Sequence, residues 1–285
     1  EIIRATSGDL DVRGGGQVIN IVMVESESSS SIAYELNVDH TWDSTNTPGA
    51  KISLTGQRGA LDYFISGERE PRYELNQSRE DSVLADGSPN DRIQRETTQD
   101  AQPLTLVGNF GYQFSERDLA HLNLQLSENN QDTELDRIIA DDKFESPVLS
   151  LQFEELPSDS ETWEIGGDYE HEFLNGSRFK TLFIANEKDD LFVRDRYDID
   201  SGNRSKNLFI SSSELTKERI VRTSYTFDAF NTQSLEIGIE RAQTILDTSL
   251  QLGLLTEGGG SSQFGGLTPV TDANGSVEEI RYEYF

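Results

Sequence analysis

Most of this chain alternates apolar and polar residues with a period of two. The clearest run places Ala120, Leu122, Leu124 and Leu126 against His121, Asn123, Gln125 and Ser127. A period of two sends successive side chains to opposite faces of a β-strand, whereas a helical period would group them three or four residues apart. The pattern therefore predicts an all-β protein whose strands carry one apolar and one polar face.

The connections between the alternating segments have two very different lengths. Short turns are predicted at Asn46–Gly49, Gly59–Ala60, Ser115–Asp118, Asn175–Gly176 and Asp228–Gln233. Long polar stretches, read as loops, cover 71–102, 129–160, 188–217 and 253–278. Together they predict an antiparallel meander of about ten long strands, joined by short turns at one end and long loops at the other.

Charge and cysteine content exclude several functions. The formal net charge is −28 and the sequence pI is about 4.3, which excludes general binding to nucleic acid because phosphate backbones attract basic surfaces. Such a charge is typical of a well-solvated surface and is compatible with cationic partners. The chain has no cysteine, so disulfides and thiolate metal sites are excluded.

The apolar face could cover a soluble core or face lipid. No run of 18 apolar residues exists, which excludes a transmembrane helix. Long strands and connections sorted by length favour a transmembrane β-barrel with a polar, hydrated interior. Aromatic residues gather beside the short turns, as at a membrane interface, although ordinary sheet packing also explains them: Tyr112, Phe114, Phe173, Phe179, Tyr225 and Phe227.

No residue pattern indicates an enzyme, a cofactor or a metal centre. The histidines are His40, His121 and His171, and no nucleophile-elbow glycine pattern surrounds any serine. A barrel enzyme would need His121 within hydrogen-bonding reach of a serine. The stretch Asp195–Gly202 lacks the ligand pattern of a calcium loop. Acidic pairs such as Asp189-Asp190 could hold divalent ions loosely, but a solvated loop explains them better.

The first two dozen residues differ from the rest. Glu1-Ile2-Ile3-Arg4 is followed by Gly14-Gly15-Gly16 and then by Gln17-Val18-Ile19-Asn20-Ile21-Val22. This stretch resembles the end of the plug domain of TonB-dependent outer-membrane receptors, which precedes their barrel. It departs from the family at Ala5-Thr6, where Gly-Pro is usual, at Gln17, which is inserted, and at Met23-Val24, where Thr-Lys is usual. The resemblance covers less than a tenth of the chain.

The resemblance implies two domains. Residues 1–28 would be the C-terminal remnant of the plug with its serine-rich linker, and residues 29–285 the first part of a barrel that has about 22 strands in the family. A complete ten-stranded barrel is the alternative. The plug motif comprises Gly14, Gly15, Gly16, Val18, Ile19, Asn20 and Ile21. In the family, the arginine that corresponds to Arg4 pairs with barrel glutamates, so Arg4 is a candidate plug–barrel latch.

The function that the resemblance implies is active uptake of a scarce ligand across the bacterial outer membrane. The ligand would be a ferric siderophore, a corrinoid or a glycan fragment, and the TonB–ExbB–ExbD system would supply energy through a TonB box upstream of Glu1. Outer-membrane lipid and lipopolysaccharide would surround the barrel. The alternative from another class is a secreted or surface β-sandwich or adhesin that binds a partner through long acidic loops. In that case Leu122, Leu124 and Leu126 would pack against a second sheet.

Overall fold

The computed structural model describes residues 2–3, 18–19, 28–141, 143, 148–230, 233–256 and 260–285, with backbone alone at 2–3, 18–19 and 230. These residues form antiparallel β-structure, so the predicted all-β class is confirmed. In the same ranges, the one helical segment is the 3-10 turn η1, Ser262–Phe264. No helix there is long and apolar enough to cross a membrane.

Thirteen strands form one sheet. Their bounds are β3 Ser28–His40, β4 Asn46–Arg58, β5 Leu61–Arg69, β6 Arg72–Val83, β7 Pro89–Ser115, β8 Asp118–Asp141, β9 Val148–Glu155, β10 Ser158–Glu172, β11 Arg178–Asp200, β12 Asn203–Phe230, β13 Gln233–Leu254, β14 Thr268–Pro269 and β15 Gly275–Tyr284. A separate pair joins β1, Ile2–Ile3, to β2, Val18–Ile19.

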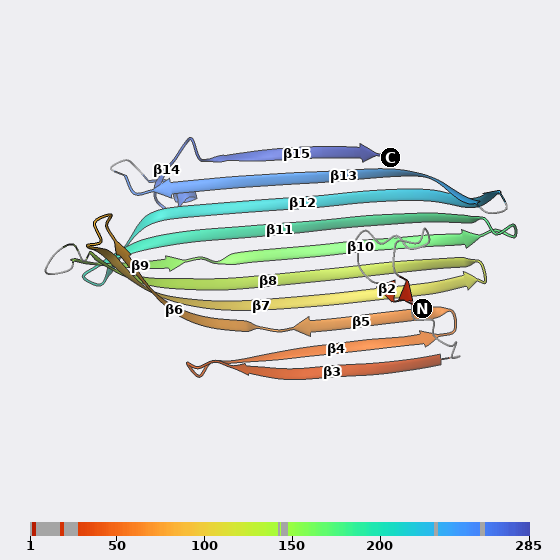
Figure 1. Ribbon diagram of the computed structural model, residues 1–285, viewed down its shortest axis with the longest axis horizontal. Coiled ribbons are helices and arrows are strands. Elements are labelled where there is room, and N and C mark those ends of the chain that lie inside the picture. The colour runs from red at the N-terminus through yellow and green to blue at the C-terminus, as the bar shows by residue number, and fades with distance from the viewer. Residues whose placement is uncertain are drawn as a thin grey trace.

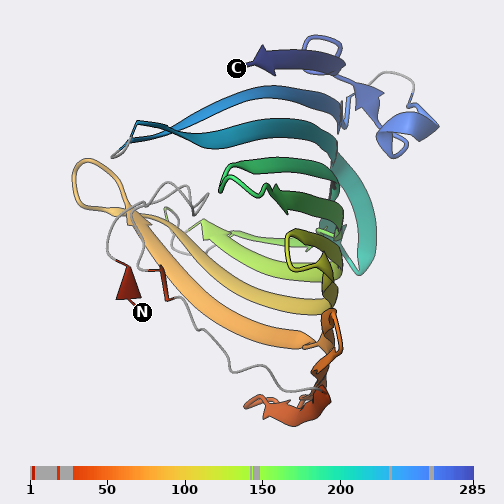
Figure 2. The ribbon, with the colours of Figure 1, turned by 90° about the vertical axis from the view of Figure 1, so that its right-hand side faces the viewer.

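The large sheet is broad and curved, with β3 at one edge and β15 at the other (Figures 1 and 2). The main path runs β3, β4, β5, β7, β8, β10, β11, β12 and β13, and β15 pairs with β13. Each long strand therefore lies beside the next long strand in the sequence. In the described ranges β3 and β15 do not pair with each other, so the sheet is an open trough.

The pairing between neighbouring strands shows which residues of the sheet lie on the same face. Residues opposite each other in an antiparallel ladder share a face. Leu124 is opposite Gly108 on β7 and Ile165 on β10. We call the face of the sheet that carries Leu124 the outer face, and the opposite one the inner face. The row of paired residues that crosses the outer face through Leu124 is Ile32, Leu54, Ile65, Gly108, Leu124, Ile165, Ala185, Arg219, Gln243 and Tyr282. The outer face is therefore apolar from β3 to β11.

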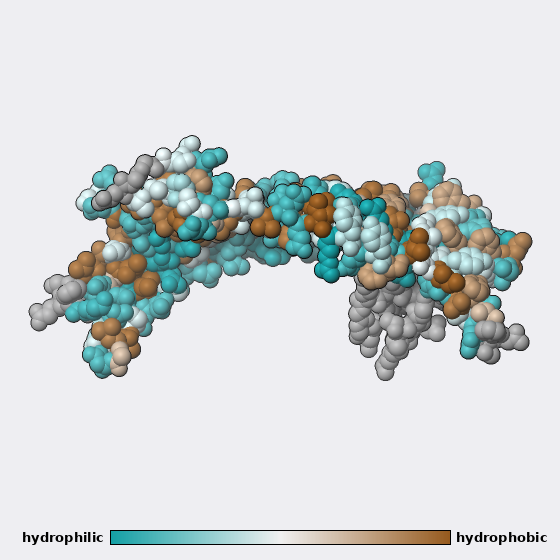
Figure 3. Space-filling model, turned by 90° about the horizontal axis from the view of Figure 1, so that it is seen from above, coloured by the Kyte–Doolittle hydropathy of each residue, from teal (hydrophilic) through white to brown (hydrophobic). Residues whose placement is uncertain are grey.

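Many of these apolar side chains are exposed. Leu122, Leu124 and Leu126 are 36%, 38% and 55% accessible, and Ile237 and Tyr34 are 59% and 78% accessible. In the part of the chain that the structure describes, no second sheet covers them. Hydrophobic side chains are visible at the surface of the space-filling view (Figure 3).

The long polar stretches predicted as loops are mostly strands, and this part of the sequence reading is wrong. Residues 72–83 and 89–101 form a hairpin of β6 with the first half of β7. Residues 130–141 belong to β8, and 188–200 with 203–217 belong to β11 and β12. The sheet thus continues well past the apolar zone, and β6, β9 and β14 raise the strand number from about ten to thirteen. In β6, the first half of β7 and the second half of β8, both faces are largely polar, so no apolar alternation marks them. In the β11–β12 extension, apolar residues stand in consecutive runs, such as Leu191-Phe192-Val193, which do not alternate either.

Two proline residues divide what would otherwise be single strands. β5 ends before Glu70-Pro71 and β6 follows, while both pair with β7. β9 ends before Leu156-Pro157 and β10 follows, while both pair with β8 and β11. Proline has no N–H to donate and interrupts a ladder. Because the neighbouring strands continue, the interruption is local.

Most predicted turns are in place. Gly59–Ala60 joins β4 to β5, Glu116-Arg117 joins β7 to β8, and Gly176, with φ of 80°, lies in the β10–β11 turn. Two details differ. Asn46–Gly49 begins β4, and the preceding turn is 41–45, with Ser44 at φ 72°. Ser28, the last residue of the predicted linker, and Ser29–Ser31 after it are the first residues of β3, since they pair with β4.

A buried carboxylate holds the extended part of the sheet together. Glu154 on β9 has a side chain only 1% accessible. Its Oε2 accepts a hydrogen bond from Arg194 Nε at 2.7 Å, from the strand on one side. Its Oε1 lies 3.2 Å from Arg137 Nη1, on the other side, although this contact lacks hydrogen-bond alignment. The short strand β9 is therefore bound by charge to both of its neighbours.

Replacing Glu154 by glutamine should leave two arginines around a neutral group in a desolvated site. Breaking a buried ion pair from one side costs about 3–5 kcal/mol, so we expect a loss of this order in the free energy of unfolding. The adjacent Glu155 is a matched control, because it is 43% accessible and 3.8 Å from Arg204; Glu155→Gln should cost less than about 1 kcal/mol. Denaturant unfolding of the purified protein measures both. Equal effects would contradict a special role for Glu154.

Candidate functional site: an acidic wall on the inner face

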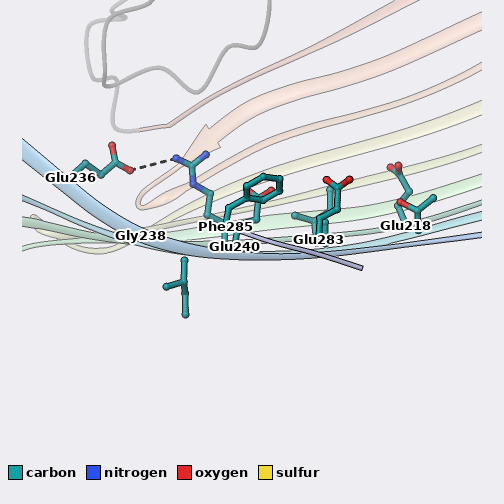
Figure 4. Close-up of a pocket in the computed structure, with 11 residues that line it drawn as sticks. Glu218, Glu236, Gly238, Glu240, Glu283 and Phe285 are labelled. Carbon is teal, nitrogen blue, oxygen red and sulfur yellow. Dashed lines mark ion pairs between the residues drawn. The ribbon is translucent and has the colours of Figure 1, made fainter. Parts of the chain in front are cut away.

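The inner face of β12, β13 and β15 gathers four glutamates. Glu240 is opposite Arg222 on β12, and Glu236 is two residues before Gly238 on the same strand. Glu283 on β15 is opposite Ala242. We call Glu218, Glu236, Glu240 and Glu283 the acidic wall. Their side chains lie on one side of the sheet (Figure 4).

The acidic wall lines a shallow hollow of about 630 Å³, together with Arg222, Gly238 and Phe285. Arg222 Nη2 lies 3.6 Å from a Glu236 oxygen. Glu218 accepts a hydrogen bond from Asn186 Nδ2 at 3.2 Å, and Glu283 pairs with Arg281 at 2.7 Å. Carboxylates outnumber the nearby guanidinium groups, so the hollow attracts a cationic partner.

Two backbone features fix this site. Glu240 and Phe285 exchange backbone hydrogen bonds of 2.9 and 3.0 Å, which set the register of β15. Gly238 lies between Glu236 and Glu240 on the inner face. A Cβ added at Gly238 would lie 2.9 Å from the Thr223 carbonyl oxygen and 3.1 Å from Ser224 Cβ. Glycine therefore lets β12 approach closely and keeps space between the two carboxylates.

The inner face across β3 to β8 has a different character. It carries hydroxyl and amide side chains around a second hollow of about 800 Å³, which includes Thr55, Gln57, Asn109 and Asn123. His121 is at the border of this region, with Nδ1 3.2 Å from both Asp168 oxygens. No serine hydrogen-bonds to His121 among the described residues, so the contact required for a barrel enzyme is not observed there.

The other two histidines contact polar side chains near strand ends. His171 Nδ1 contacts Asp118 Oδ1 at 2.7 Å, and its ring meets Phe173 edge-on at 4.5 Å. His40 contacts Asn46 at 2.9 Å beside the first turn. Both therefore stabilise strand ends.

The calcium-loop-like stretch is part of the β11–β12 hairpin, and neighbouring side chains occupy its carboxylates. Asp195 accepts a hydrogen bond from Lys206 at 2.7 Å, and Asp198 accepts one from Gln152 at 3.0 Å. Burial opposes the positive charge of Lys206, but its contact with Asp195 outweighs burial and raises the pKa of Lys206. These carboxylates serve the hairpin itself.

Most of the predicted plug residues cannot be placed. Arg4, Gly14, Gly15, Gly16, Asn20 and Ile21 lie outside the described residues. Val18 and Ile19 form β2, which is opposite Ile3 and Ile2. The opening segment and the strand after the glycines therefore pair with each other in the backbone.

Sequence reasoning missed the acidic wall as a site. Its signal was present, because Glu236, Gly238 and Glu240 form the polar side of one alternating strand. Glu218 and Glu283 come from the neighbouring strands β12 and β15. Whether they lie beside Glu236 and Glu240 depends on the registers of those strands, which alternation alone does not specify.

Comparison with models of protein families, with curated proteins and with solved structures found no match to this chain.

Replacing Gly238 by alanine should destabilise the fold, because the added methyl group meets backbone at van der Waals overlap. Overpacking of this kind costs about 1–3 kcal/mol. Gly275, at the start of β15, is the matched control, since nothing lies within 4 Å of a Cβ added there. We expect Gly275→Ala to leave the thermal midpoint unchanged and Gly238→Ala to lower it, as followed by circular dichroism. Equal midpoints would show that β12 and β13 are not this close.

Proposed function

We propose that this chain is the plug end and adjoining barrel wall of a TonB-dependent receptor that takes up a scarce ligand across the bacterial outer membrane. The observation that carries the proposal is the exposed, apolar outer face, which runs in register across most of the sheet. In water such a face would be a large aggregation-prone surface. In a bilayer it would be the lipid contact of a transmembrane β-barrel.

The height of the apolar zone supports the proposal. On β10 and the residue after it, the zone runs from Trp163 to Phe173. Ten residue steps at about 3.3 Å give about 33 Å along the strand. A strand tilt of about 40° reduces this to about 25 Å, the usual height of the apolar band of an outer-membrane barrel. Beyond Trp163 the outer face becomes acidic at Glu161, which is opposite Glu128 and Asp189.

Aromatic packing at the short-turn end also supports it. Tyr112 and Phe114 have ring centroids 4.7 Å apart. Phe173 and Tyr225 are 5.8 Å apart, and Tyr225 and Phe227 are also 5.8 Å apart. Rings grouped beside the short turns are expected where barrel strands leave the bilayer on the periplasmic side.

The acidic wall suits the role that the resemblance assigns to Arg4. A receptor plug must be held in the barrel and yet be released during transport. Carboxylates on a hydrated wall can pair with plug arginines at a modest cost of separation, because water and salt screen exposed ion pairs. Glu236, Glu240 and Glu283 are therefore the proposed barrel side of the Arg4 latch.

The β-sandwich or adhesin alternative needs a second sheet over the outer-face leucines, and the described residues provide none. Fractionation of the full-length protein separates the two functions. We expect it in the outer-membrane fraction, extractable only with detergent, and with gel mobility that changes on heating. A water-soluble protein with unchanged mobility would exclude the receptor.

Placing a charge on the outer face should block membrane assembly, whereas the same charge on the inner face should not. An arginine facing lipid near the bilayer centre costs about 2–4 kcal/mol. We expect Leu122→Arg, which lies opposite Gly167 near the middle of the Trp163–Phe173 zone, to lower the amount of heat-modifiable protein in the outer membrane, and the adjacent Asn123→Arg to leave it near wild type. If both variants assemble equally, the outer face does not contact lipid.

Neutralising the acidic wall should loosen the plug. With Glu236, Glu240 and Glu283 all changed to glutamine, we expect a passive leak that admits a large, normally excluded antibiotic and lowers its inhibitory concentration. Three outer-face changes, Glu128→Gln, Glu161→Gln and Asp189→Asn, are the matched control, because they remove similar charge from the opposite face. A leak in the control alone, or in neither variant, would contradict the latch.

A further inference from the structure

The inner face of the sheet is divided into two sectors at the same depth. One register row crosses it through Ser31, Thr55, Phe64, Asn109, Asn123, Gly166, Ile184, Ile220, Ala242 and Glu283. The rows above and below add Ser53, Ser66, Gln125 and Gln57 on the β3–β8 side. On the β10–β15 side they add Glu164, Glu218, Arg222 and Glu240. We call the β3–β8 part of these rows the neutral sector, where Asp62 is the one carboxylate among the described residues.

The two sectors interact with a passing solute differently. A hydrogen bond between neutral groups contributes about 0.5–1.5 kcal/mol net, whereas one to a charged group contributes about 1.5–3 kcal/mol. Serine, threonine and amide groups therefore exchange partners easily. The acidic wall would retain cations and repel anions, and under the proposed function it is already committed to holding the plug.

The neutral sector also has room and a surface for a hydroxyl-rich molecule. Its hollow of about 800 Å³ includes Phe64, with the hydrogen-bonding groups of Thr55 and Asn109 opposite it on either side. Its ionisable groups, Asp62 and the His121–Asp168 pair, lie together in the row below Phe64. Gly111 is opposite His121, and a Cβ added there would lie 3.2 Å from the imidazole Cδ2. Glycine thus lets the ring lie close to β7, which leaves the hollow open above it. An aromatic face between donors and acceptors suits a molecule that is polar at its edges and apolar on its faces.

We propose that the ligand passes along the neutral sector and that this wall selects an uncharged, polyhydroxylated solute such as an oligosaccharide. This inference rests on the proposed receptor function and adds the substrate class and the side of the barrel on which passage occurs. The ferric siderophores and corrinoids that the resemblance also allows become the disfavoured ligands.

Single cysteines can test the route, because the chain contains none. Asn109→Cys places a thiol in the neutral sector, and Ala242→Cys places one in the acidic wall at the same depth. Two membrane-impermeant probes are added to cells that produce the full-length protein: a glucose-linked maleimide, which is uncharged, and a sulfonated maleimide of similar size. Labelling rates are compared with and without a protonophore that removes the energy source.

In energised cells, we expect the Asn109→Cys thiol to react with the uncharged probe about tenfold faster than in cells treated with the protonophore. In the same energised cells, the sulfonated probe should react with this thiol about tenfold more slowly than the uncharged probe, since a negative lumen depletes anions. The Ala242→Cys thiol should stay slow with both probes in both conditions. Equal reaction at the two positions, equal rates for the two probes at Asn109→Cys, or no reaction there in energised cells would overturn the proposal. Asn123→Cys, in the same row, repeats the test if Asn109→Cys does not assemble.

A third variant separates this inference from the receptor function. Leu124→Cys lies in the adjacent outer-face row, so the membrane should shield its thiol from both probes. If Leu124→Cys reacts as fast as the thiol of Ala85→Cys, in the exposed β6–β7 turn at the opposite end of the sheet from the short turns, the membrane location itself fails. If Leu124→Cys is shielded while Asn109→Cys and Ala242→Cys react alike, only the route and the ligand class fail.

Discussion

The register of the antiparallel ladder is the constraint on which the rest of this molecule depends. A shift of one residue between two strands would exchange their faces, moving leucines to the hydrated side and carboxylates to the apolar side. Fifteen paired residues join β10 to β11, and the pairing of β11 with β12 continues over nearly all of β11. Both the exposed apolar band and the acidic wall exist because these registers agree from one strand to the next.

The apolar zone was predictable from sequence, and the polar extensions were not. In Ala120–Ser127 each second residue is apolar, so the strand and its faces can be read directly. In Glu128–Asp136 the outward residues are Glu128, Asn130, Asp132, Glu134 and Asp136, and most inward residues are polar too. A strand that is hydrated on both faces has no apolar face, so its sequence lacks the alternation of apolar and polar residues from which strands are predicted. It is stabilised instead by its neighbours' backbone hydrogen bonds and by contacts such as Arg137–Glu154–Arg194, which join residues far apart in the sequence.

The candidate site shows the same limit. Glu236, Gly238 and Glu240 could be assigned to one polar face from their spacing, but their neighbours Glu218 and Glu283 could not. The hollow exists only once β12, β13 and β15 lie side by side in one register. Arg4, which the resemblance to TonB-dependent receptors marks as the latch, lies outside the described residues, so its pairing with this wall stays a prediction.

The prolines have a mechanical consequence. Pro71 and Pro157 interrupt β5–β6 and β9–β10, and Pro103 lies on β7 beside the first interruption, one row from where the apolar zone ends. Each lacks an amide hydrogen, so the ladder is weakest along this line. β8, β11 and β12 continue through this line without a break, so the prolines thin the ladder locally and do not separate the polar hairpins from the apolar zone. In native-state hydrogen exchange, backbone amides beside the prolines would then exchange faster than those of the unbroken strands.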